Sequence, residues 1–272
     1  MTAAEHWKRQ LADWAIPDEL LDAVEDSPYR WPVELFRRRN ISADESGPSP
    51  TVELVDRMAG PGGSVLDIGA GTGRVSIPLA RSGHPVTAVE RSTEMAAALR
   101  QEVADVDGYR VVEGSWPLDE DLGAFDVTLA AHVVYDVADL GPFLRSMTEH
   151  ASRAVVLEMT DTHPWAPLGP YYRALHGLDR PAGPTVDDLV AVVTEECGVR
   201  PEVEWWERPG GTWFESWAEI EELYRRRLVL PAARAGELRP LLEPDVRDVG
   251  DGRLVVGEPI RRLATVWWTV GD

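Results

Sequence analysis

Several residue types that support common protein chemistries are almost missing from this chain. Cys197 is the only cysteine among the 272 residues, so neither an intrachain disulfide nor a metal site of several cysteines can form. Lys8 is the only lysine, which almost excludes lysine as a Schiff-base nucleophile or general base. No apolar run approaches the roughly 20 residues that cross a bilayer as a helix. These absences predict a protein of the cytoplasm, where thiols stay reduced.

Positive charge is scarce as well. The chain has 47 acidic residues against 27 lysines and arginines, a formal net charge of -20. Such an excess repels nucleic-acid phosphates unless basic residues form a local patch. The densest basic clusters, residues 37–39 and 225–227, lie in helical patterns, where consecutive side chains point in different directions. We interpret them as solvated helix faces and expect no nucleic-acid partner.

The most informative stretch is VLDIGAGTGRVSIPLA, residues 65–80. Its apolar beginning predicts a short buried strand, Gly69, Gly71 and Gly73 follow at every second position, and an apolar pattern typical of a helix comes next. In a doubly wound α/β fold such a loop holds a polar or anionic ligand. The glycines allow the backbone to approach the ligand, and the helix N-terminus offers unpaired N–H groups.

A regular alternation of strands and helices follows this loop. Near-continuous apolar runs predict strands at residues 84–90, 109–115 and 153–159, with another inside 125–135. Helical patterns lie between them, one starting at Ser92 and one at residues 140–150. Apolar strands joined by helices predict a parallel sheet covered on both faces.

The flanking segments break this rhythm. Residues 1–50 predict short helices followed by a Ser-, Gly- and Pro-rich linker at 41–50. We expect them to form an N-terminal helical lid with Tyr29, Arg30 and Trp31 at its inner tip; the alternative is a helical layer that completes the core. The main domain is then 51–272, with insertions at about 160–186 and 212–245. Residues 186–197 predict a helix, and residues 215–242 predict two.

Two ligand classes compete for the glycine loop. A dinucleotide fingerprint that starts at Gly69 needs its third glycine at position 74, which is Arg74 here. The third glycine is instead Gly73, so the loop departs from the nicotinamide pattern. Glu90, at the end of the second strand, can bind a ribose diol in either class and does not discriminate between them.

The same residues resemble the class I S-adenosylmethionine-dependent methyltransferases. The resemblance rests on residues 65–73, Glu90, the polar Ser115 and Phe125-Asp126-Val127, and it covers about residues 51–160. It implies a doubly wound, seven-stranded Rossmann-like sheet whose last two strands form a hairpin, supplied here by residues 203–207 and 262–268 with a long insertion between them. It also implies S-adenosyl-L-methionine as cofactor and S-adenosyl-L-homocysteine as product.

Physical chemistry agrees with this ligand at the loop. A sulfonium ligand has no phosphate, so Asp67 beside the loop is tolerable, whereas beside a pyrophosphate it would be repulsive. Glu90 would accept the two ribose hydroxyls, and Met95 would lie against the adenine. The expected cofactor-binding residues are Asp67, Gly69, Ala70, Gly71, Gly73, Glu90, Arg91, Met95, Ser115, Trp116 and His132.

The expected reaction is direct in-line methyl transfer, which requires positioning of the acceptor and removal of a proton but no metal. Acceptor contacts should come from the carboxyl ends of the fourth and fifth strands. There we expect His132, Tyr135 and His163 as catalytic residues, with Trp31 and Trp165 nearby. For each histidine the alternatives are a base, an acceptor-orienting group or a structural side chain.

The segment after the fourth strand reads AAHVVY and lacks the (Asn/Asp)-Pro-Pro-(Tyr/Phe) motif of methylases acting on amide or base amino groups. With the acidic charge, this favours a small-molecule acceptor, methylated on oxygen or nitrogen. Two alternatives stay open: a nicotinamide-dependent oxidoreductase, and an S-adenosylmethionine-binding protein without catalysis. The protein is expected to be a monomer or homodimer.

Overall fold

The computed structural model describes residues 1–29, 32–211 and 213–271, with the side chains of residues 39 and 41–46 left out. Arg30 and Trp31, expected at the inner tip of the lid, lie outside the described residues. Within these ranges, no helix combines the length and the apolar character that crossing a membrane would require.

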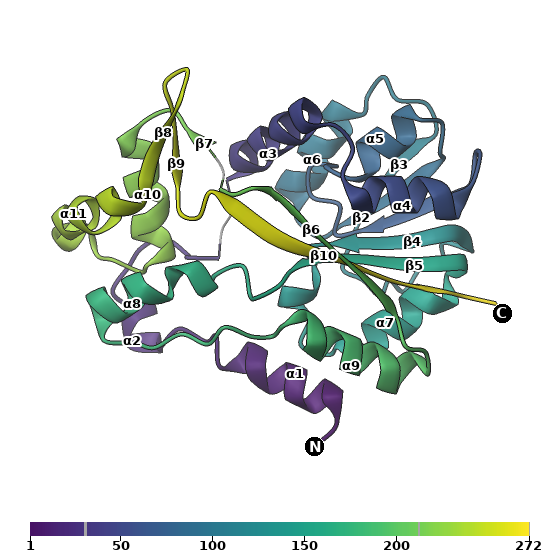
Figure 1. Ribbon diagram of the computed structural model, residues 1–272, viewed down its shortest axis with the longest axis horizontal. Helices are drawn as coiled ribbons and strands as arrows, with labels where there is room; N and C mark the ends of the chain where they lie inside the picture. Colours follow the sequence, from purple (N-terminus) through teal and green to yellow (C-terminus); the bar gives the residue numbers. More distant parts are fainter. Residues whose placement is uncertain (30–31, 212, 272) are drawn as a thin grey trace.

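A seven-stranded sheet forms the centre of the molecule, in the order β3-β2-β1-β4-β5-β10-β6 (Figure 1). Its strands are β1 (Val65–Ile68), β2 (Val86–Glu90), β3 (Tyr109–Glu113), β4 (Phe125–Ala131), β5 (Ala151–Thr160), β6 (Glu202–Pro209) and β10 (Ile260–Thr269). The first five are parallel, and β10 runs antiparallel to both β5 and β6. The predicted α/β sheet is confirmed, including the hairpin between its last two strands.

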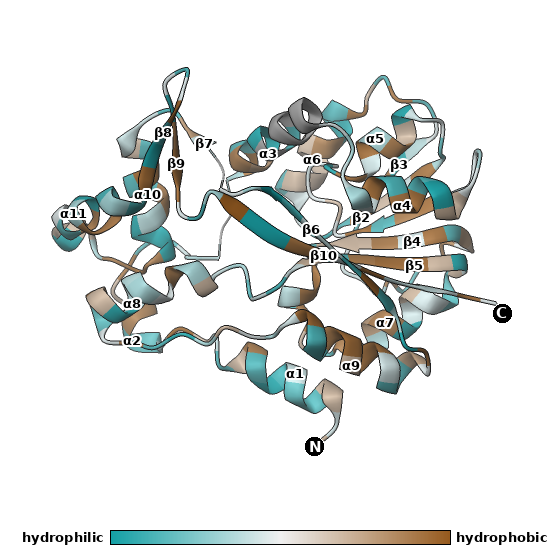
Figure 2. Cartoon of the chain, viewed as in Figure 1, coloured by the Kyte–Doolittle hydropathy of each residue, from teal (hydrophilic) through white to brown (hydrophobic). Residues whose placement is uncertain are grey.

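Strand hydropathy follows position in the sheet. In Figure 2 the central strands β4 and β5 are mostly hydrophobic, and nearly all residues of β5 are buried. The edge strand β6 alternates between exposed and half-buried positions instead. Strands covered on both faces need continuous apolar runs, whereas an edge strand keeps polar residues toward solvent.

Helices cover both faces of the sheet. On one face α4 (Pro50–Ala59) and α5 (Ser76–Arg81) pack on β1, β4 and β5, with α6 (Thr93–Glu102) beside β2. On the other face α7 (Leu140–Glu149) and α9 (Val186–Cys197) share a core with α1 (Ala3–Ala12). Side-chain oxygens of Ser49, Ser92 and Thr185 accept backbone N–H groups at the starts of α4, α6 and α9.

The N-terminal helices divide between two places. Trp7 of α1 is fully buried, and its indole Nε1 donates to the carbonyl of Val137 at 2.9 Å, so α1 completes the core. After the short α2 (Asp18–Leu21), α3 (Val33–Ser46) continues through residues 41–46. The predicted linker is therefore wrong over those six residues, because they contain no glycine or proline to end the helix before Gly47.

A second, small sheet lies in the chain between β6 and β10. It has the order β7-β9-β8, formed by β7 (Trp213–Phe214), β9 (Arg253–Val256) and β8 (Val246–Gly250). The predicted helices of this region are α10 (Trp217–Arg227) and α11 (Leu238–Leu242), with the 3-10 turns η3 (Ala232–Glu237) and η4 (Glu243–Asp245). Strands β7 and β8 were not predicted from the sequence, because a two-residue strand and an exposed polar strand show no apolar periodicity.

The segment after β5 packs against this small sheet. It contains the 3-10 turn η2 (Ala166–Leu168) and α8 (Gly169–His176), while η1 (Val134–Asp136) follows β4. Tyr171 and Tyr172 of α8 share a hydrophobic cluster with Phe214, Ile220 and residues of α11. The two regions expected as insertions therefore form one body beside the carboxyl edge of the main sheet (Figure 1).

Candidate active site

A large cavity opens at the carboxyl edge of the sheet, with a volume of about 2020 Å³. Its walls are the glycine loop, the ends of β4 and β5, the β6–β10 edge, and residues of α3, α8 and α10. Ordinary small-molecule sites have about 300–1,000 Å³. The cavity therefore has room for two ligands side by side.

The three glycines of the loop have different surroundings. All have left-handed backbone angles, with φ of 71° at Gly69, 58° at Gly71 and 83° at Gly73. A Cβ atom would lie 2.5 Å from a Val133 methyl group at Gly69 and 2.6 Å from Ile77 at Gly73. At Gly71 the nearest atom would be a Phe36 ring carbon at 3.9 Å. Gly69 and Gly73 permit close packing, whereas Gly71 borders the open cavity.

Glu90 ties the glycine loop to the end of β2. Its Oε2 accepts the N–H of Gly71 at 2.8 Å, and its Oε1 accepts the N–H of Ser92 at 2.8 Å. A carboxylate has about four lone-pair sites, so each oxygen can still accept a ligand hydroxyl. The carboxylate is buried and lines the cavity.

Asp67 is a second buried carboxyl beside the loop. Burial raises its pKa to about 6, against the opposing effects of the Ser76 hydroxyl and the Arg74 guanidinium. A carboxylate destabilised by burial gains when a cationic or hydrogen-bond-donating ligand approaches it.

The other expected cofactor residues occupy the same side of the cavity. Ala70, Met95, Ser115 and Trp116 line it, and so does Arg91, which forms an exposed ion pair with Asp136 at 3.0 Å. Of the eleven residues in the predicted set, Gly73 is outside the lining, because it packs on Ile77 and Leu99.

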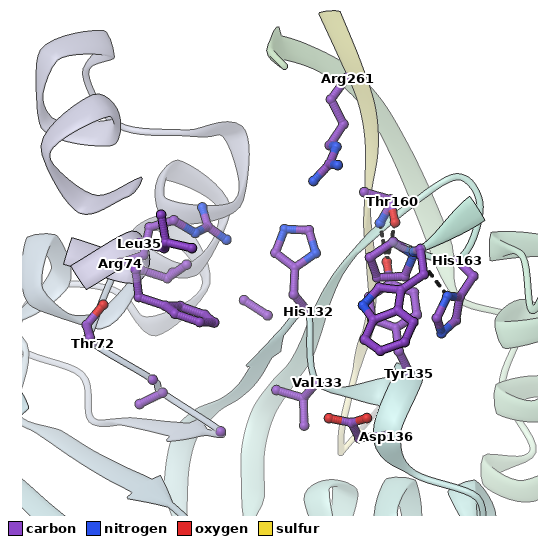
Figure 3. A pocket seen from close by; sticks show the side chains of 18 of the residues that line it. Leu35, Thr72, Arg74, His132, Val133, Tyr135, Asp136, Thr160, His163 and Arg261 are labelled. Atoms are coloured by element: carbon purple, nitrogen blue, oxygen red, sulfur yellow. Dashed lines mark hydrogen bonds between the residues drawn. The ribbon is translucent and has the colours of Figure 1, made fainter. Parts of the chain in front are cut away.

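His132 follows β4 in an unusual backbone conformation. Its φ is +60°, rare for a residue with a side chain, and its N–H donates to the carbonyl of Glu158 at 2.8 Å. Figure 3 shows the ring between Arg74 on one side and Tyr135 on the other. Strained backbone of this kind clusters at functional sites.

A buried carboxylate lies behind the His132 ring, and the sequence analysis missed it. Glu158 is fully buried, forms an ion pair with Arg74, and has its Oε1 2.9 Å from His132 Nε2. Burial alone would raise the pKa of Glu158, but Arg74 and His132 hold that pKa well below its usual range. Its only sequence signal is an acidic residue inside the apolar run AVVLEMT.

Burial also lowers the pKa of His132 to about 4, although Glu158 opposes the shift. Burial and Arg180 lower the pKa of His163 to about 3. Both imidazoles are therefore neutral near pH 7. A neutral imidazole offers one donor and one acceptor nitrogen.

Tyr135 and His163 form an aromatic wall. The Tyr135 hydroxyl lies 2.6 Å from Thr160 Oγ1 and accepts the N–H of Thr160. Thr160 Oγ1 donates its proton to the carbonyl of Thr162, so the Tyr135 hydroxyl must be the donor in its own hydrogen bond with Thr160 Oγ1. His163 stacks on Trp14 at 4.0 Å between ring centroids and meets Tyr135 edge-on at 5.5 Å. Because the Tyr135 hydroxyl is hydrogen-bonded to Thr160 of β5, Tyr135 offers the cavity its ring and not its hydroxyl.

The expected aromatic neighbour Trp165 does line the cavity, and Tyr29 stacks on it at 5.6 Å. Its predicted companion Trp31 lies outside the described residues. Two further lining residues were not expected from the sequence: Arg208 of β6 and Arg261 of β10. Neither lies in a motif, since only the antiparallel pairing of the two strands brings them to the cavity.

Within the described ranges, no three His, Cys, Asp or Glu side chains come together in a way that could hold a metal ion.

Comparison with known proteins identifies the central part of the chain. Residues 66–153 match a family model described as a methyltransferase domain. A stretch of 85 residues is 45% identical to the ubiquinone biosynthesis O-methyltransferase of Caulobacter sp. (strain K31), covering 30% of this chain and 34% of that protein. A 127-residue stretch is 38% identical to the protein of the same name from Paramagnetospirillum magneticum, covering 43% of this chain and 46% of that one. The chain thus matches about a third to a half of the length of these relatives.

Solved structures extend the likeness in fold to nearly the whole chain. The YcgJ protein of Bacillus subtilis superposes with a TM-score of 0.53 at 14% identity, covering 82% of this chain and 98% of that one. Coclaurine N-methyltransferase, solved with N-methylheliamine and SAH, has a TM-score of 0.51 at 15% identity, covering 97% and 93%. At these identities the likeness is one of fold alone.

Proposed function

Because residues 66–153 match a methyltransferase-domain model, we propose that this protein is a class I S-adenosylmethionine-dependent methyltransferase that transfers a methyl group to a small molecule. The observation that carries the proposal is the cavity, which has room for two ligands and borders Gly71 and Glu90. The matched relatives are O-methyltransferases by name, which favours oxygen as the methylated atom.

The residues beside the glycine loop fit this cofactor. Gly71 leaves space for a ligand against the backbone, and Glu90 keeps lone pairs for two ribose hydroxyls. Asp67 adds a second carboxyl, which suits a ligand without phosphate. When bound, S-adenosylmethionine supplies an electrophilic methyl group on a sulfonium.

His132 is the residue best placed to act on the acceptor. Its ring faces the cavity, and its Nε2 faces the Glu158 carboxylate, which leaves Nδ1 as the cavity-facing acceptor of a hydrogen bond. With a pKa of about 4 it is a weak base. It orients an acceptor hydroxyl and takes the proton as the new C–O bond forms, when that hydroxyl becomes strongly acidic. Tyr135 and His163 shape the wall beside it.

Ligand binding separates this function from the oxidoreductase alternative. S-adenosylmethionine and S-adenosylhomocysteine should each raise the melting temperature. A ligand at one hundred times its Kd stabilises the folded protein by about 2.7 kcal/mol. NAD should not. Stabilisation by NAD with no effect of either sulfur ligand would overturn the proposal.

A measurement of methyl transfer separates the proposed methyltransferase from an S-adenosylmethionine-binding protein without catalysis. His132→Asn, chosen because asparagine tolerates a positive φ, should lower kcat about a hundredfold or more and keep cofactor affinity within a few-fold. The readout is methyl transfer to an acceptor found by screening, with Arg225→Gln, at a surface pair with Asp26, as the unaffected control. Full activity of the asparagine variant would remove His132 from the reaction.

We also assign the lid role within residues 1–50 to α3. Leu35 and Phe36 line the cavity, and Asn40 Nδ2 donates to the carbonyl of Thr72 in the glycine loop at 2.7 Å. Residues 51–272 form the main domain. The single cysteine and the net charge of -20 support a cytoplasmic monomer or homodimer that acts on a small molecule and not on nucleic acid.

A further inference from the structure

Three arginines that line the cavity lie close enough for the charges of two of them to act on the third, Arg208. Arg74 comes from the glycine loop, Arg208 from β6 and Arg261 from β10. Arg208 and Arg261 are direct partners in the antiparallel β6–β10 register. Because Leu263 pairs with Thr160, the last residue of β5, Arg261 lies beyond the end of that strand. Figure 3 shows Arg261 extending toward the His132 ring.

One buried carboxylate is shared among these arginines. Glu158 forms an ion pair with Arg74, and its charge also acts on Arg208. In the part of the chain that the structure describes, Arg208 and Arg261 form no ion pair and no hydrogen bond through their side chains. Burial and the neighbouring Arg74 lower the pKa of Arg208 to about 10, although Glu158 opposes the shift. In a chain of net charge -20, two unpaired guanidinium groups at one cavity wall are a feature that needs a partner.

The strands that carry this pair are remote from β1, the strand before the glycine loop, although the side chain of Arg74 reaches from the loop close enough to act on Arg208. Along the sheet β10 is three strands from β1, through β4 and β5. At about 4.8 Å per strand this separates the two walls by about 14 Å. Arg208 and Arg261 therefore lie on the side left for the second ligand.

Aromatic rings accompany these arginines. Tyr135 and Tyr224 line the same part of the cavity, and the charge of Arg261 acts on both hydroxyl groups. A guanidinium group binds carboxylate or phosphate oxygens through charge-assisted, often bidentate, hydrogen bonds. Aromatic rings beside it pack an apolar or aromatic molecular body.

We propose that the methyl acceptor is an aromatic or apolar molecule carrying an oxyanion, a carboxylate or a phosphate, which Arg208 and Arg261 bind together. This inference rests on the proposed methyltransferase function. It assigns Arg208 and Arg261 as specificity residues and leaves Arg74 as the partner of Glu158.

The test is calorimetry on protein saturated with S-adenosylhomocysteine. The probes are matched pairs of aromatic carboxylic acids and their primary amides, with aryl phosphates as a third arm that separates the two oxyanions. Wild-type protein should bind one of the two anionic classes at least about tenfold more tightly than the amides, and high salt should reduce the difference. Arg208→Gln and Arg261→Gln should abolish the preference.

Two control variants test whether a lost preference comes from the missing guanidinium groups. Arg208→Lys, which keeps the charge and loses the planar fork, should keep part of the preference and shows that the site still folds. Arg110→Gln, at an exposed pair with Glu120 on the far edge strand β3, should change nothing.

The outcomes are distinct. Equal binding of acids, phosphates and amides to wild-type protein overturns the inference, and so does an anion preference that survives both glutamine substitutions. Loss of S-adenosylhomocysteine affinity in the glutamine variants would mean that the arginines bind the cofactor carboxylate, so the inference would fail and the proposed function would stand. Failure of wild-type protein to bind S-adenosylhomocysteine would overturn both.

Discussion

The two walls of the cavity differ in their buried charged groups. On the glycine-loop wall, Asp67 and Glu90 are buried carboxyl groups beside backbone N–H groups. On the wall formed by β5, β10 and β6, the side chains are guanidinium groups and aromatic rings, with Glu158 behind them. A sulfonium-containing ligand without phosphate fits the first wall, and an anionic molecule fits the second.

The walls also differ in how the chain builds them. The glycine-loop wall comes mainly from residues 67–95, one strand–loop–helix unit and the strand after it. The opposite wall combines residues near 135, 160, 208, 224 and 261. Local sequence can specify the first because its parts are joined by short connections. The second depends on strand order, since β6 and β10 are about 50 residues apart in the chain and adjacent in the sheet.

Gly71→Ala is the substitution expected to have the largest effect on this contrast. The new methyl group would enter the space where a ligand approaches the loop, and cofactor affinity should fall about a hundredfold, or about 2.7 kcal/mol. Gly62→Ala is the matched control, because its φ of +69° imposes a similar backbone cost at a position with nothing within 4 Å. Calorimetry with S-adenosylhomocysteine measures both. Equal affinity in the two variants would place the ligand away from Gly71.

Glu90→Gln should have a smaller effect. The amide oxygen can keep one backbone contact of the loop, but a charged acceptor is lost, and each such hydrogen bond is worth about 1.5–3 kcal/mol. We expect cofactor affinity to fall between about tenfold and a hundredfold, with the melting temperature changed much less. Glu113→Gln, on the exposed end of β3, serves as the control. Unchanged affinity of Glu90→Gln would remove Glu90 from the ribose.

The third expected effect is on stability and not on affinity, and it comes from the opposite wall. His132 and His163 are neutral when folded, with pKa values of about 4 and about 3, whereas in the unfolded chain each takes up a proton below about pH 6.5. At these two groups the unfolded state then binds more protons, and Asp67, with its pKa raised to about 6, offsets only part of the difference, so the free energy of unfolding should fall as pH decreases from about 6.5 toward 4. At pH 5 the loss is about 2 kcal/mol per histidine.

Urea unfolding at a series of pH values measures this dependence. His132→Asn and His163→Phe should each reduce the slope between pH 6.5 and 5, and Arg225→Gln, at the surface pair with Asp26, should not. Glu158 acts in a lower window, because a carboxyl with a depressed pKa loses its contribution only as pH falls below about 4.5. A flat profile between pH 6.5 and 5 would show that the two imidazoles are not held neutral.

The sheet was largely predictable from the sequence. Strands buried on both faces leave continuous apolar runs, and β1, β2, β4 and β5 follow such runs. The errors lie where local signals are weak. The polar stretch of residues 41–46 continues α3, and the small sheet of β7, β8 and β9 has two strands without apolar periodicity.

The residues of the candidate site also fall into a group that the sequence predicted and a group that it did not. The glycine loop, Glu90, His132 and His163 could be found because each follows directly after a predicted strand. Glu158, Arg208 and Arg261 could not, since an isolated charge in a strand does not indicate what faces it. Gly73 was assigned to the ligand from the motif, but its surroundings place it in packing with Ile77 and Leu99.

By itself, then, the sequence determined the parallel α/β core, the ligand-holding loop and its preference for a ligand without phosphate, because these depend on residues a few positions apart. The tertiary structure alone decided that α1 completes the core while α3 covers the loop, and that Arg208 and Arg261 become neighbours in the cavity that Glu90 also lines. The physical reason is that a side chain's electrostatic surroundings come from its neighbours across the sheet, and strand order sets those neighbours.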